Sequence, residues 1–203
     1  MWSRGLHGLI NRAVERFARD TYGDAFWTSV AQSAGLEFST FEAMLPYAYE
    51  TTERVVEALA EALDTRQDEV LEDLGTYLVA SPNTDGLRRL LRFGGTGFVE
   101  FLNSLDELPA RAQLAVPDLP MPQLELREVD PTTFTLAVTA TPETGDLFGH
   151  VMVGLLRAMA DDYGALVFLN HMQDAPGQEI IEIILLEVAF AEAREFELGA
   201  RAG

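Results

Sequence analysis

Cysteine is absent from the 203-residue sequence, which excludes disulfide bonds, thiolate catalysis and cysteine-ligated metal sites. Lysine is absent as well, so the 14 basic residues are all arginine, against 33 acidic residues. The resulting net charge of −19 repels phosphate backbones and anionic lipid headgroups. We therefore expect neither nucleic-acid binding nor membrane binding.

Long hydrophobic runs are also missing. Residues 1–17 carry charges throughout and lack the apolar segment of a signal peptide. The most apolar stretch, residues 180–190, is interrupted by Glu182 and Glu187 and is shorter than the roughly 20 residues that a membrane-spanning helix needs. These absences lead us to expect a cytoplasmic protein.

Catalytic motifs are missing too. The glycine cluster at residues 94–97 has no following Lys-Ser/Thr pair, so it does not resemble a phosphate-binding loop. The acidic residues between 64 and 73 are spaced around a helix and indicate a solvated face instead of a metal site. We expect no enzyme activity, no catalytic residue and no metal ligand.

What the sequence does contain is strong hydrophobic periodicity, and its composition of 48% hydrophobic and 23% charged residues is that of a globular protein. Helical spacing in the first 97 residues predicts helices within residues 6–17, 25–34, 51–63, 70–79 and 87–91. A connecting segment with helical turns is expected at residues 38–49. After Pro122, alternating patterns predict strands at 124–129, 134–139, 165–169 and 179–190, with a helix at 147–159. The prediction is an α+β fold, in which an N-terminal helical subdomain packs on a C-terminal four-stranded antiparallel sheet with intervening helices.

Residues 98–124, FVEFLNSLDELPARAQLAVPDLPMPQL, carry a further pattern. An apolar helical segment ends in Asp106-Glu107-Leu108-Pro109, and after another helical turn or two a proline-rich segment follows with Pro117, Pro120 and Pro122. This layout resembles the proximal segment of the haem nitric oxide/oxygen-binding (H-NOX) family, the sensor domains of soluble guanylate cyclases and bacterial gas receptors. The resemblance covers roughly residues 6–190. It implies that Pro109 stands where the family has its iron-binding histidine.

The resemblance also implies domain boundaries. We expect a single H-NOX-like sensor domain at residues 1–190, with a helical lobe at about 1–97 and a proximal helix and sheet lobe at about 98–190. Residues 191–203 are expected to be a tail or a linker to a downstream module.

Two haem-holding features of the family are absent. Proline has no side-chain donor atom, whereas five-coordinate haem needs an axial ligand such as imidazole. The family's Tyr-x-Ser-x-Arg motif for the haem propionates corresponds here to Val138-Thr139-Ala140-Thr141-Pro142, which has neither tyrosine nor arginine. The sequence therefore predicts that haem is absent and that the domain has no cofactor. His7, His150 and His171 are interpreted as surface or packing residues, with His150 the nearest to the expected cavity.

The family's pocket positions, transferred by the resemblance, are all apolar in this chain. They predict a ligand-binding set of Ile10, Val14, Leu78, Pro82, Leu105, Leu108, Pro109, Pro122, Leu124, Val151 and Leu155. Such positions either pack into a collapsed core or surround a retained cavity. An elongated apolar molecule such as a fatty acid would fill a cavity, and a helix N-terminus, a backbone amide or an arginine would be needed for its carboxylate.

The function predicted from these observations is that of a haem-independent, non-enzymatic sensor domain that binds a fatty acid or a similar lipid-like molecule. The resemblance implies an effector such as a histidine kinase or a cyclase. Two alternatives stay open: a haem-based gas sensor with a non-standard axial ligand, and a ligand-free protein-interaction module.

Overall fold

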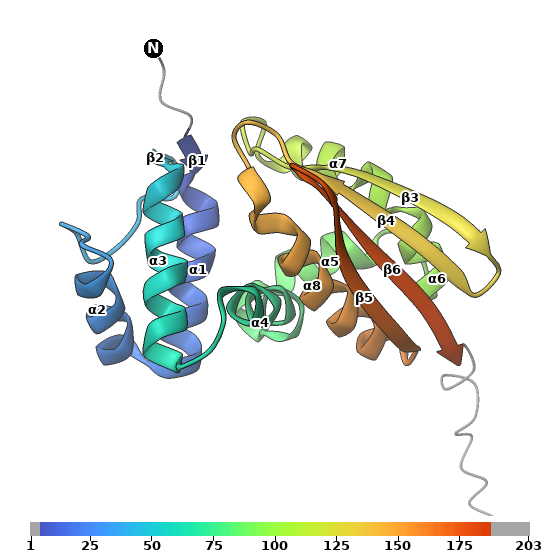
Figure 1. Cartoon of the computed structure of the whole chain (residues 1–203), viewed down its shortest axis with the longest axis horizontal. Coiled ribbons are helices and arrows are strands. Elements are labelled where there is room, and N and C mark those ends of the chain that lie inside the picture. Colours follow the sequence, from blue (N-terminus) through green and yellow to red (C-terminus); the bar gives the residue numbers. More distant parts are fainter. Residues whose placement is uncertain (1–4, 188–203) are drawn as a thin grey trace, which may run out of the picture.

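A computed structural model describes residues 5–187. Figure 1 shows α1, α2 and α3 on one side and a four-stranded sheet on the other, with α4 and α8 between them. The α-helices are α1 (Gly8–Tyr22), α2 (Asp24–Ser33), α3 (Tyr49–Leu63), α4 (Gln67–Ala80), α5 (Asp85–Arg92), α6 (Phe98–Asn103), α7 (Leu108–Ala115) and α8 (Phe148–Tyr163). Short 3-10 helices are η1 (Pro82–Thr84), η2 (Leu105–Glu107) and η3 (Gly145–Leu147). The strands are β1 (Gly5–His7), β2 (Pro46–Ala48), β3 (Gln123–Asp130), β4 (Thr133–Thr139), β5 (Leu166–Ala175) and β6 (Gln178–Glu187).

The N-terminal helices surround an apolar core. His7 precedes α1, and its Nδ1 accepts a hydrogen bond from the backbone N–H of Leu9 at 3.1 Å and so caps the helix. In α2, Trp27 is fully buried, and its indole N–H donates to the carbonyl of Ser39 at 2.8 Å. This bond satisfies the only polar atom of the indole, so the ring is buried without an unpaired donor. β1 and β2 pair antiparallel and hold the start of α1 beside the start of α3.

The C-terminal lobe is an antiparallel sheet in the order β3-β4-β6-β5. Because side chains alternate between the two faces of a strand, every second residue of β4 and β6 points to the same face. The buried apolar residues of these two strands on this face are Phe134, Leu136, Val138, Ile181, Ile183 and Leu185. They form one apolar cluster with the buried residues of α6 and α8. One face of the sheet is thus covered by helices.

Helices α4 and α8 connect the two lobes, and two glycines bring their backbones together. A Cβ at Gly75 of α4 would lie 2.0 Å from the carbonyl oxygen of Val151, and a Cβ at Gly154 of α8 would lie 1.8 Å from the carbonyl oxygen of Glu72. The hydroxyl of Thr76 donates to the carbonyl of Gly154 at 3.3 Å. Only residues without a Cβ permit this approach, so the packing of the lobes depends on these two positions.

The predicted α+β fold class is confirmed, and all the predicted helices and strands are present, some with different ends. The prediction of helical turns at 38–49 is wrong, because this segment forms turns, bends and β2. β1 and β2 were not predicted, since three-residue strands are too short to show an alternating pattern. β5 extends to Ala175, six residues beyond the predicted end at 169, and therefore includes His171. The predicted tail at 191–203 and the last residues of the predicted strand at 179–190 lie outside the described residues.

Within the described residues 5–187, no helix combines the length and the hydrophobicity required to cross a bilayer. The proposed boundaries of the domain stay a prediction.

Replacing Gly154 by alanine tests the contact between α4 and α8. The added methyl group would meet the backbone of Glu72, so we expect the Gly154→Ala variant to lose about 1–3 kcal/mol of unfolding free energy. The matched control is Gly86→Ala in α5, where a Cβ meets nothing within 4 Å and the change should stabilise the protein by up to about 1 kcal/mol. Urea unfolding monitored by circular dichroism measures both values. Equal effects of the two substitutions would contradict the packing argument.

Candidate functional site

A cavity of about 640 Å³ lies between the N-terminal helices and the C-terminal lobe. α1, α4, α5, α7 and α8 contribute to its wall, which is mostly aliphatic and aromatic. Its volume lies within the range of roughly 300–1,000 Å³ that is typical of sites for small molecules and cofactors. The two lobes therefore leave a cavity beside the close contact of α4 and α8.

Six of the eleven predicted ligand-binding residues line this cavity: Ile10, Val14, Leu78, Leu108, Val151 and Leu155. Five do not: Pro82, Leu105, Pro109, Pro122 and Leu124. Leu105 and Leu124 are instead buried in the core of the C-terminal lobe. Binding of a ligand by the six lining residues stays a prediction.

The position of Pro109 follows from the geometry of α7. Pro109 lies in the first turn of this helix, where the missing N–H of proline costs no helical hydrogen bond. Leu108 and Ala112, four residues apart, share one face of the helix and line the cavity. Since successive residues of a helix are rotated by about 100°, Pro109 points away from the face that Leu108 and Ala112 share.

Polar side chains gather at one side of the cavity. Arg12 and Arg16, four residues apart on α1, both contribute to the lining. Arg12 is partly buried and lies 3.3 Å from Oε1 of Glu15, while Arg16 is exposed. Glu15 is itself buried, and its Oε2 accepts a hydrogen bond from the backbone N–H of Phe41 at 2.8 Å. Two guanidinium groups thus contribute to the lining, Arg12 paired with Glu15 and Arg16 exposed, and guanidinium groups can bind an anionic part of a ligand.

A hydrogen-bonded group links three elements beside this cavity. The Tyr77 hydroxyl of α4 donates to the carboxylate of Asp20 on α1, and Asn83 of η1 donates to the same oxygen at 2.8 Å. The bond from Tyr77, followed by that from Asn83, lowers the pKa of Asp20 below its ordinary value. Burial, reinforced by the bond to Asp20, raises the pKa of Tyr77 to about 12. Tyr77 is therefore a neutral hydrogen-bond donor at physiological pH.

Sequence reasoning missed three lining residues with potential metal-donor atoms, Tyr77, Met121 and Met152. Met152 is 3% exposed on α8, and Met121 lies between α7 and β3. The predicted pocket contains only residues at the family's pocket positions. Tyr77, Met121 and Met152 are adjacent to such positions and are therefore not part of it. His150 does not line the cavity, and its ring contacts His171 instead.

The fold has counterparts in known proteins. The sequence profile of the family described as Haem-NO-binding (HNOB) matches residues 7–171, which is most of the chain. The chain belongs to the Haem-NO-binding family. The resemblance predicted from residues 98–124 is thereby confirmed.

The relatives include animal cyclases. The chain is 24% identical over 185 residues to soluble guanylate cyclase gcy-31 of Caenorhabditis elegans, covering 91% of this chain and 26% of the relative. It is 21% identical over 125 residues to soluble guanylate cyclase 89Da of Drosophila melanogaster, covering 62% of this chain and 19% of the relative. The chain thus spans about a quarter or less of the length of these curated relatives.

Solved H-NOX structures share the fold. The Fe(II) unliganded H-NOX protein from K. algicida superimposes with a TM-score of 0.71 at 15% identity, covering 90% of this chain and 97% of the other. An H-NOX protein from S. oneidensis in the Fe(II)NO ligation state also gives a TM-score of 0.71 at 15% identity, covering 90% of this chain and all of the other.

The family membership overturns one prediction. The expectation that the domain has no cofactor and no haem is wrong, because the matching family is a haem-binding one. The residues of the cavity fit part of such a group: an apolar wall suits the porphyrin faces, and Arg12 and Arg16 suit its carboxylates. Imidazole is not among the lining side chains of the described residues, so the lining does not contain the family's usual iron-binding group.

The Tyr77 hydroxyl gives a pH-dependent prediction. Because Asp20 has a lowered pKa in the folded protein, its contribution to stability is present above the unfolded pKa and is lost as the pH falls through the folded value. We expect the Tyr77→Phe substitution to lower the free energy of unfolding by about 1 kcal/mol or less at neutral pH, because Asp20 is exposed. At acidic pH the difference in unfolding free energy between the variant and the wild type should become smaller. Urea unfolding at a series of pH values measures this difference.

The control for this experiment is Tyr22→Phe. Within the described residues, the Tyr22 hydroxyl has no hydrogen-bond partner. Its ring packs against that of Phe26 with the centroids 4.9 Å apart, a usual distance for an aromatic pair. A Tyr77→Phe difference that stays constant down to strongly acidic pH would contradict the role assigned to Asp20.

Proposed function

We propose that the chain is a haem-dependent gas-sensing domain in which a side chain other than histidine would hold the iron. The main support is a cavity of about 640 Å³, apolar along its walls and cationic at one side, in a chain of the Haem-NO-binding family. When bound, haem supplies a ferrous iron to which a diatomic gas can coordinate. The fold class and the family support the predicted gas-sensor alternative better than the haem-independent sensor.

Arg12 and Arg16 are the proposed anchors for the propionates. They stand on one face of α1 because residues four apart in a helix are neighbours. Guanidinium groups bind carboxylates through two parallel hydrogen bonds, which fixes both position and orientation. This pair takes over the role that the resemblance assigns to the absent Tyr-x-Ser-x-Arg motif.

Met121 and Met152 are the residues that would hold the iron of haem through their sulfur atoms. A thioether is an established ligand of haem iron, whereas the leucine and alanine that α7 presents to the cavity have no donor atom. Tyr77 is a poorer candidate because its pKa of about 12 disfavours the phenolate, which would be the iron ligand. His150, the histidine nearest to the expected cavity, has its ring against His171 instead.

Signalling would follow if haem or gas binds one arrangement of the two lobes better than another. The cavity is lined from both lobes, so its occupant contacts both and can favour one arrangement. We propose residues 1–190 as the sensor domain and residues 191–203 as a tail or a linker to a downstream module. The relatives named soluble guanylate cyclases support a cyclase as effector, and the family resemblance adds a histidine kinase.

A fatty acid as occupant stays a prediction from the sequence. The same cavity and the same arginines would accept an apolar carboxylate, so the occupant must be identified directly.

Haem reconstitution tests the proposed function. Purified untagged chain is titrated with haemin, reduced and exposed to NO, and the Soret band is followed by absorbance. We expect one haem per chain. Met121→Leu or Met152→Leu should shift the Soret band and weaken haem binding at least about tenfold, because leucine keeps the volume and removes the sulfur donor.

The controls match the variants in chemistry and burial. Met159→Leu changes a buried methionine of the same helix α8 that does not line the cavity, and it should leave the spectrum unchanged. Arg16→Gln should weaken haem binding about two- to fivefold, because the arginine is exposed, whereas Arg54→Gln on the exposed face of α3 should not. No Soret band, together with a fatty acid in the organic extract of the protein, would refute the proposal in favour of the lipid. Wild-type spectra in both methionine variants would refute methionine ligation.

A further inference from the structure

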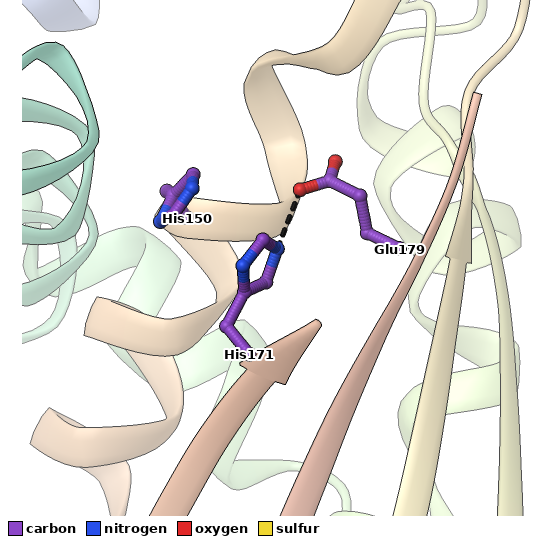
Figure 2. Close-up of side chains that lie close together, drawn as sticks. All are labelled: His150, His171 and Glu179. Atoms are coloured by element: carbon purple, nitrogen blue, oxygen red, sulfur yellow. Dashed lines mark hydrogen bonds and ion pairs between the residues drawn. The ribbon is translucent and has the colours of Figure 1, made fainter. Parts of the chain in front are cut away.

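Two histidines and a glutamate from three elements meet at one end of the sheet. Figure 2 shows His150 of α8 beside His171 of β5, with Glu179 of β6 bonded to His171. The ring centroids of the histidines are 4.1 Å apart, and Nε2 of His171 lies 2.6 Å from Oε2 of Glu179. One potential ligand atom from each of the three residues lies within 4.8 Å of the other two.

The register of the sheet explains why the two strand residues converge. His171 is paired with Ile181 across β5 and β6, so Glu179 is its diagonal neighbour, two residues along the partner strand. Ile181 is fully buried on the helix-covered face of the sheet, and the two-residue period of a strand puts Glu179 on that same face. The carboxylate is accordingly 8% exposed and the imidazole of His171 18% exposed.

Helix α8 completes the group from the other side. His150 lies in the first turn of this helix and is 23% exposed. The preceding residue is Gly149, where a Cβ would lie 1.9 Å from Oε2 of Glu179. The missing side chain at 149 thus gives the carboxylate of Glu179 room beside the helix.

A neighbouring carboxylate helps to hold His150 in place. Nδ1 of His150 lies 3.5 Å from Oε1 of Glu72 on α4, and Glu72 accepts a hydrogen bond from Arg157 at 2.8 Å. Carboxylates that bond to ligating histidines are the usual outer partners of a metal site. The group is buried enough to hold its geometry and open enough for solvent to complete the coordination.

We propose that His150, His171 and Glu179 form a binding site for a divalent transition metal ion of the zinc class. Two imidazoles and one carboxylate are a ligand set that zinc accepts, with solvent in the remaining position. The absence of thiolates and the presence of imidazoles favour Zn²⁺, Co²⁺ or Ni²⁺ over the hard cations Ca²⁺ and Mg²⁺. The bound ion would tie α8 to the hairpin of β5 and β6.

The proposed site differs from two expectations drawn from the sequence. His150 and His171 were interpreted as surface or packing residues, and no metal ligand was expected. The signal was present in β6, where Glu179 falls in phase with the buried residues Ile181, Ile183 and Leu185. This pattern alone did not indicate a site, because β5 was predicted to end at residue 169. The strand in fact extends to Ala175 and includes His171.

Metal titration of the untagged chain, dialysed against a chelator and kept free of haem, tests the site. Calorimetry with ZnCl₂ should show one ion per chain, and CoCl₂ alone should give visible d–d absorption. Each of His150→Gln, His171→Gln and Glu179→Gln should weaken Zn²⁺ binding at least about tenfold. Zinc should also raise the melting temperature of the wild type more than that of these variants.

Matched controls are His7→Gln and Glu128→Gln. His7 is the remaining histidine and caps α1, and glutamine retains an acceptor there, while Glu128 is exposed on β3. Both should bind zinc as the wild type does, and circular dichroism checks that every variant is folded. No binding at millimolar zinc, or affinities in folded site variants equal to that of the wild type, would overturn the site. Because haem is left out, the outcome does not depend on the proposed gas-sensing function.

Discussion

The close packing of α4 against α8 is the contact on which both candidate sites depend. Gly75 and Gly154 remove the Cβ atoms that would separate the two backbones. The same helices then turn different faces to different neighbours: Leu74 and Leu78 of α4 and Val151 and Leu155 of α8 line the cavity. On another face, Glu72 of α4 reaches His150 of α8. A change in the separation of the two helices would alter the cavity and the histidine cluster together.

An apolar cavity of this size cannot be neutral for stability. The cavity has a volume of about 640 Å³. If it were a closed dry void, a cost of ~24 cal/mol per Å³ would lower the unfolding free energy by roughly 15 kcal/mol, which is as much as the whole stability of an ordinary domain. The polar side with Arg12 and Arg16 admits water and reduces this cost. Water next to an aliphatic wall is still unfavourable, so an occupant that replaces it stabilises the fold. This argument supports a resident ligand whatever its identity.

The helices and the sheet could be predicted from the sequence because their signals are local. The periodicity of α1 and the alternation of β4 are each contained in fewer than about 20 consecutive residues. The meeting of residues from separate elements depends on contacts between segments that are far apart in the sequence, and no local pattern predicts it. Pro109 illustrates the limit, because its place in the chain suggested a cavity wall, whereas the rotation of α7 presents Leu108 and Ala112 instead. The pair Met121 and Met152 was missed for the same reason: the sequence gives no distance between the segment before β3 and α8.

The neighbouring positions 150 and 151 on α8 give the two proposals a physical connection. His150 belongs to the histidine cluster, whereas Val151 lines the cavity and its carbonyl oxygen contacts Gly75. A metal ion that fixes the first turn of α8 against β5 and β6 therefore fixes one wall of the cavity as well. If an occupant of the cavity prefers one position of this wall, the metal and the occupant change each other's affinity by the same factor, since coupling between two binding sites is reciprocal. The rigid contact at Gly75 and Gly154 is what would transmit this coupling, because a backbone packed without intervening side chains has little freedom to absorb a shift.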